Sequence, residues 1–178
     1  MLPNLISLFR LLLVPLVIGL IANGEWHWAL YGFIVAGGSD ALDGFIARAY
    51  NLRTELGAYL DPLADKALLV SIFIELGVLG LFPVWLVILV VSRDFMIVGG
   101  IILAWLLGAP MTIRPAALSK LNTVGQILLA AIVLGIKAFE LDVPNLLCFW
   151  EYGVMALTTA SMVVYLIQWL RHFPDETV

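Results

Sequence analysis

The stretch that decides the fold is residues 39–65, SDALDGFIARAYNLRTELGAYLDPLAD. In a chain that is 63% hydrophobic and only 12% charged, this stretch holds four aspartates, Asp40, Asp43, Asp61 and Asp65. Carboxylates in so apolar a chain repel one another and are costly to remove from water, so they indicate a functional site. Divalent cations bound by the carboxylate oxygens would offset the repulsion.

The aspartates are spaced as two pairs. Asp40 and Asp43 are three residues apart, which places both on one face of a helix. Asp61 and Asp65 are four residues apart, which does the same on a second helix. The polar residues 49–56 between them predict the turn of a helix hairpin that directs all four carboxylates at one another. Each pair spans about 5 Å of helix axis, which suits one or two shared metal ions.

The remainder of the chain predicts an all-α integral membrane protein. Six apolar spans each meet or approach the roughly 20 residues needed to cross a bilayer, and helices satisfy their own backbone hydrogen bonds in lipid. The 178 residues indicate a single domain over residues 1–178, with the metal site in the hairpin between the second and third helices. The expected spans are residues 5–22, 28–49, 62–79, 83–107, 115–137 and 146–170.

The basic residues predict the orientation of these spans. The N-terminus, the second and fourth loops and the C-terminus hold or adjoin seven of the nine Lys and Arg residues, whereas the opposite loops hold mainly acidic residues. The positive-inside rule therefore places both termini and the aspartates on the cytoplasmic side, or the matrix side in a mitochondrion. A water-soluble nucleotide would reach the site from that side.

A longer pattern surrounds the aspartates. Residues 40–65 read D-x-x-D-G-x-x-A-R, then eight residues, then G-x-x-x-D-x-x-x-D. This pattern resembles the signature of the CDP-alcohol phosphotransferases at every defined position. The resemblance implies a membrane enzyme that uses Mg²⁺ or Mn²⁺, with two ions in the site, and releases CMP from a CDP-linked lipid. It also implies a homodimer.

The resemblance assigns roles to residues of the signature. Asp65 would be the base that deprotonates the incoming alcohol, and it would also contact metal. The expected metal ligands are Asp40, Asp43, Asp61 and Asp65. The residues implied for binding of the cytidine diphosphate portion are Asp40, Gly44, Arg48 and Gly57; the two glycines also allow close approach of a substrate or backbone.

Three shorter strings resemble one branch of this family. They are the opening PNLISLFR at residues 3–10, SRD at residues 92–94 and SKLNT at residues 119–123. They resemble the branch of CMP-forming cardiolipin synthases, found in bacterial inner and mitochondrial inner membranes. That branch implies CDP-diacylglycerol as donor and phosphatidylglycerol as acceptor. The alternative is the phosphatidylglycerolphosphate synthase branch, whose acceptor is soluble glycerol 3-phosphate and which more typically reads R-E and G-K-x-K-T at the last two places.

An anionic acceptor needs cations near headgroup depth, and three are candidates for its phosphate: Arg93, Arg114 and Lys120. Arg93 lies inside the fourth span, where a charge requires a partner. Asp94 is one candidate, although adjacent residues of a helix point in different directions. Arg93 and Asp94 as a purely structural pair, and Arg114 and Lys120 as ordinary positive-inside residues, remain open.

Two other function classes remain open. An ion transporter predicts acids dispersed over several helices near the midplane, whereas these acids cluster on one hairpin near one leaflet. A structural membrane subunit has no need for the matched pattern. No nucleic-acid partner is indicated. The sequence therefore predicts a phospholipid-synthesising transferase.

Overall fold

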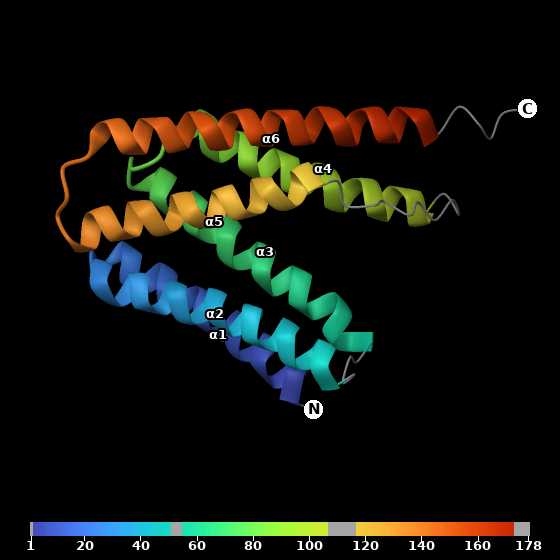
Figure 1. The fold of residues 1–178 in the computed structure, drawn as a ribbon, viewed down its shortest axis with the longest axis horizontal. Coiled ribbons are helices and arrows are strands. Elements are labelled where there is room, and N and C mark those ends of the chain that lie inside the picture. Colours follow the sequence, from blue (N-terminus) through green and yellow to red (C-terminus); the bar gives the residue numbers. More distant parts are fainter. Residues whose placement is uncertain (1, 51–54, 107–116, 173–178) are drawn as a thin grey trace, which may run out of the picture. The chain divides into compact units, whose positions relative to one another are not determined.

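The computed structural model describes the backbone of residues 2–50, 55–106 and 117–172, and the side chains of residues 9, 11–38, 66–100 and 118–170. This part of the chain is all helical, with short turns and no strand (Figure 1). In chain order the helices are α1 (Leu2–Ala22), α2 (Trp26–Tyr50), α3 (Glu55–Val78), α4 (Val84–Leu106), α5 (Ala117–Ala138) and α6 (Pro144–His172).

The helices match the six predicted spans in order, and the all-α prediction is confirmed for the described residues. The largest difference is at α3, which begins at Glu55 and not at residue 62, so the polar residues expected in the turn partly extend the helix. Helix formation there needs no apolar side chains, because the backbone hydrogen bonds are local. Two described segments, Leu118–Ala138 and Pro144–Leu170, are long and apolar enough to cross a membrane. Six membrane spans and a single domain stay predictions.

The chain forms two compact units. The first consists of Met1–Phe82 and Ala130–Val143, and in it α1 packs against both α2 and α3. Its core includes Val17, Phe33 and Phe73, all buried. Gly32 allows α2 to approach α1 closely, because a Cβ at this position would lie 2.9 Å from Cγ2 of Val17. This unit carries the helices that hold all four aspartates.

The second unit consists of Pro83–Leu129 and Pro144–Val178, so α5 contributes its first half here and its second half to the first unit. Helix α4 packs against α6, and a Cβ at Gly125 of α5 would meet Leu157 of α6 at 3.4 Å. Large apolar side chains such as Phe95 and Phe149 are more than 70% exposed. Exposed apolar side chains in such number indicate a surface that contacts a membrane or another protein.

Three helices end in the same way. Gly24 after α1 and Gly80 after α3 have φ of 75° and 71°, and Glu140 after α5 has φ of 51°. In each case the next amide reaches back to a carbonyl of the last turn; Leu81 N, for example, donates to Leu76 O at 2.8 Å. These left-handed residues end the helices and satisfy free carbonyls.

Candidate active site

The structure places the four aspartates on the two adjoining halves of α2 and α3. Asp40 and Asp43 lie in the second half of α2, whereas Asp61 and Asp65 lie in the first half of α3. The backbone around each pair is helical, as the spacing predicts. Their side chains lie outside the described residues, so the directions of the carboxylates stay a prediction.

Chain length keeps the two pairs near each other. Five peptide links join Tyr50 to Glu55, so the adjoining ends of α2 and α3 lie at most about 18 Å apart. Asp43 lies about 10 Å along the axis from the end of α2, and Asp61 lies about 9 Å from the start of α3. Because α2 also contacts α3 directly, the two pairs lie at comparable depth along neighbouring helices.

The donor set of this hairpin fits a hard divalent cation. Four carboxylates supply only oxygen ligands, which Mg²⁺ and Mn²⁺ prefer, and no cysteine or histidine lies between residues 40 and 65. Among the side chains that the structure describes, no other group of three or more histidine, cysteine or acidic residues could hold a metal ion. The four oxygen donors make the hairpin the candidate metal site.

The remaining residues of the signature follow the same helices. Gly44 and Arg48 lie on α2 at positions one and two turns after Asp40, and Gly57 lies on α3 one turn before Asp61. Helical spacing places Gly44 and Arg48 on the face that carries Asp40. The side chain of Arg48 lies outside the described residues, and its contact with a diphosphate stays a prediction.

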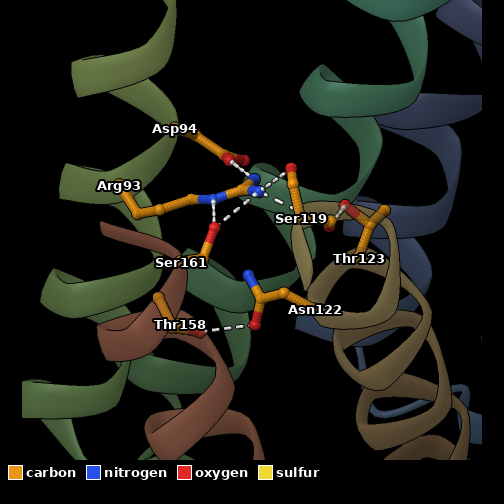
Figure 2. Close-up of polar contacts among 7 residues, drawn as sticks. All are labelled: Arg93, Asp94, Ser119, Asn122, Thr123, Thr158 and Ser161. Carbon is orange, nitrogen blue, oxygen red and sulfur yellow. Dashed lines mark hydrogen bonds and ion pairs between the residues drawn. The ribbon is translucent and has the colours of Figure 1, made fainter. Parts of the chain in front are cut away.

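A second polar cluster lies in the second unit, around Arg93 of α4 (Figure 2). The Arg93 side chain is 1% exposed, and its Nη1 donates to Oδ1 of Asp94 at 2.6 Å. The long arginine side chain reaches back to its own neighbour although the two residues leave the helix in different directions. The buried charge thus has the partner that its position requires.

Arg93 also joins three helices. Its Nη2 donates to the hydroxyl of Ser119 at the start of α5 and, at 3.5 Å, to the Ser119 carbonyl. Its Nε and Nη2 donate to Oγ of Ser161 on α6 at 3.4 and 3.3 Å. The guanidinium carbon lies 6.0 Å from the centre of the Tyr165 ring, which adds a cation–π contact.

The other two candidate cations are placed differently. Lys120 is exposed in the first turn of α5, directly after Ser119, which Arg93 binds. Arg114 lies outside the described residues. The structure thus brings Arg93 and the start of α5 together, and it leaves the Lys120 ammonium accessible.

Sequence reasoning singled out Asn122 within the string SKLNT but missed three other buried polar residues of α5 and α6, namely Gln126, Thr158 and Ser161. Oγ1 of Thr158 donates to Oδ1 of Asn122 at 2.8 Å, and Ser161 lies three residues further along α6. Gln126 follows Asn122 by one turn of α5, and all four residues are buried. A signal was present, because Asn122 and Gln126, like Thr158 and Ser161, are polar pairs at helical spacing inside apolar spans.

Comparison with known proteins adds independent findings. The model of the family described as CDP-alcohol phosphatidyltransferase matches residues 1–170. A cardiolipin synthase (CMP-forming) from Homo sapiens is 35% identical over an alignment of 176 positions that covers 89% of this chain and 58% of the relative. A CDP-diacylglycerol--glycerol-3-phosphate 3-phosphatidyltransferase from Bacillus subtilis is 36% identical over an alignment of 157 positions that covers 79% of this chain and 80% of the relative.

A third relative belongs to the second of these activities. CDP-diacylglycerol--glycerol-3-phosphate 3-phosphatidyltransferase 1, chloroplastic, from Oryza sativa is 34% identical over an alignment of 192 positions that covers 97% of this chain. The chain spans 58% of the length of the human and rice relatives. Because relatives with the two acceptors are about equally similar, overall identity does not distinguish between the acceptors.

Proposed function

The chain belongs to the CDP-alcohol phosphatidyltransferase family, and from this premise we propose that it makes cardiolipin. It would transfer the phosphatidyl group of CDP-diacylglycerol to a hydroxyl of phosphatidylglycerol and release CMP. The observation that carries the proposal is the family match over residues 1–170, together with relatives from human and rat that are named CMP-forming cardiolipin synthases. The short strings SRD and SKLNT add support for the same branch.

The hairpin residues would carry the donor half of the reaction. Asp40, Asp43, Asp61 and Asp65 would hold two Mg²⁺ or Mn²⁺ ions, which when bound neutralise the diphosphate and the charge on departing CMP. Gly44, Arg48 and Gly57, with Asp40, would bind the cytidine diphosphate portion. Arginine suits this task because its planar fork pairs with phosphate oxygens.

Asp65 would carry the acceptor half. Its carboxylate would accept the proton of the acceptor hydroxyl while that oxygen forms a bond to the phosphorus that bears diacylglycerol. The bond from this phosphorus to CMP breaks in the same transfer, and its electron pair leaves with CMP. A general base of this kind typically contributes about 10²–10⁴-fold to the rate.

The acceptor phosphate would be bound by Arg93, Arg114 and Lys120. The exposed Lys120 is available to a headgroup in the described structure, whereas Arg93 is engaged with Asp94, Ser119 and Ser161. Arg93 binds Ser119, the residue directly before Lys120. By fixing the first turn of α5 in this way, Arg93 can hold the exposed Lys120 in position. These contacts support a structural role for the pair of Arg93 and Asp94, in addition to the proposed role of Arg93 in phosphate binding.

We further propose that the protein lies in a bacterial inner or mitochondrial inner membrane as a homodimer, with the aspartates facing the cytoplasm or matrix. The two long apolar segments of α5 and α6 and the distribution of basic residues support the location. Light scattering in mild detergent and chemical crosslinking in native membranes test the dimer. A monomer by both methods would contradict it.

One assay tests the acceptor. Purified protein receives CDP-diacylglycerol, a divalent metal and one acceptor at a time, and lipid products are identified by mass spectrometry. When phosphatidylglycerol is the acceptor, formation of cardiolipin and CMP in equal amounts supports the proposal. Consumption of glycerol 3-phosphate but not phosphatidylglycerol would instead assign the phosphatidylglycerolphosphate synthase activity. The rice and Bacillus relatives are named for that activity. Asp65→Asn serves as the inactive control.

A further inference from the structure

Two buried amide groups on α5 lack the partners that their burial demands. Asn122 is 0% exposed and Gln126 is 1% exposed. Within the described structure, Nδ2 of Asn122 and Nε2 of Gln126 have no hydrogen-bond partner. A buried donor without an acceptor carries its full desolvation cost, and buried polar groups in native proteins are almost always paired.

The Thr158 contact fixes one end of the Asn122 amide. Because Oγ1 of Thr158 donates to Oδ1, the amide nitrogen is directed away from Thr158. Figure 2 shows this nitrogen pointing to the side on which Arg93 and Ser161 lie. If the amide were turned over, its oxygen would be the atom without a partner, so one polar atom of Asn122 needs a further ligand in either orientation.

The spacing of the two amides defines the ligand. Residues four apart on a helix lie on one face with Cβ atoms about 5–6 Å apart, so both amide nitrogens can direct a hydrogen bond of about 2.9 Å at one oxygen atom between them. The facing helix α6 supplies the hydroxyl of Thr158, which donates to Asn122 and can still accept a hydrogen bond, whereas the Ser161 oxygen already accepts two from Arg93. A molecule with two lone pairs and two hydrogens matches this set of groups.

We propose that Asn122 and Gln126 bind an ordered internal water molecule between α5 and α6. The water accepts from both amide nitrogens and donates to a hydroxyl of α6, which gives the roughly three hydrogen bonds that buried waters typically make. The water continues the row of polar contacts that begins where Arg93 binds Ser119, further along α5. Its hydrogen bonds to both helices hold α5 against α6. The site is independent of the proposed enzymatic activity.

The first test is the melting temperature of purified Gln126→Met in detergent, without substrates. Methionine keeps the length of the side chain but removes the donor, so a bound water loses one of its partners. The variant should melt roughly 2–4 °C below the wild type. If Gln126 were merely a dry, unpaired donor, the same change would remove a penalty and raise the melting temperature, which would overturn the proposal.

Gln168→Met on α6 is the matched control, because Gln168 is only partly buried. It should shift the melting temperature by no more than about 2 °C. The second test is a wild-type structure at a resolution that shows water, where density should lie within hydrogen-bond distance of both amides. Empty density there would overturn the proposal. A loss of stability seen only with added phosphatidylglycerol would also overturn it and assign the oxygen to the lipid headgroup.

Discussion

At the scale of single residues, Arg93 shows how one side chain can join three helices. Its fork of donors serves Asp94 on its own helix, Ser119 on α5 and Ser161 on α6, with almost no exposure to solvent. Lysine also has three donors, but they share one nitrogen, whereas these partners are reached from three separate nitrogens of the planar guanidinium. The position therefore requires arginine and not merely a cation.

Arg93→Lys should lower the melting temperature and raise the acceptor KM about tenfold, because at least one charge-assisted contact worth about 1.5–3 kcal/mol is lost. The KM for CDP-diacylglycerol should change little. Thermal unfolding and steady-state kinetics check these outcomes, with the exposed Lys137→Ala as control. A fall in stability with an unchanged acceptor KM would assign Arg93 a purely structural role.

Asp65→Asn should reduce turnover by about 10²–10⁴-fold while CDP-diacylglycerol still binds, because the amide cannot accept the hydroxyl proton. Asp61→Asn should in addition weaken metal binding. Single-turnover kinetics and donor-binding titrations separate the two effects. The exposed Asp142→Asn is the control and should match the wild type. Wild-type turnover in Asp65→Asn would refute the assignment of the base.

At the scale of elements, three helices end at a left-handed residue, which is glycine in two of them and glutamate in the third. Gly24 and Gly80 adopt left-handed backbone freely, whereas Glu140 at φ 51° pays the steric cost that a Cβ brings. Glu140→Gly should therefore stabilise the protein, by up to about 1 kcal/mol. Gly80→Ala should destabilise it through the backbone alone, because a Cβ there meets no atom within 4 Å. Melting temperatures that move in the opposite directions would contradict this account.

At the scale of the whole molecule, the aspartates that we propose for the donor chemistry and the polar cluster around Arg93 belong to different units of the chain. The first unit carries the aspartates on α2 and α3, and the second carries Arg93 and the start of α5. Turnover should thus depend on metal, whereas the contacts around Arg93 should not depend on metal. Stripping with excess chelator should abolish CMP release, and Mg²⁺ or Mn²⁺ should restore it, because only oxygen ligands are offered. Undiminished CMP release after stripping would refute a metal-dependent reaction, and a melting temperature unchanged by stripping would support separate stabilisation of the second unit.

The sequence by itself determined the six helices, the positions of the aspartate pairs on two adjoining helices and the family. Helical spacing, apolar length and a motif are local properties, and local backbone hydrogen bonding makes them readable from one chain. Only the tertiary structure decided that Arg93 binds Asp94, Ser119 and Ser161, that Thr158 binds Asn122, and that Gln126 is buried. Those contacts join residues 26 to 68 positions apart, apart from the Asp94 pair. Which helix faces are buried against each other depends on packing, and that packing cannot be read from the period of one helix.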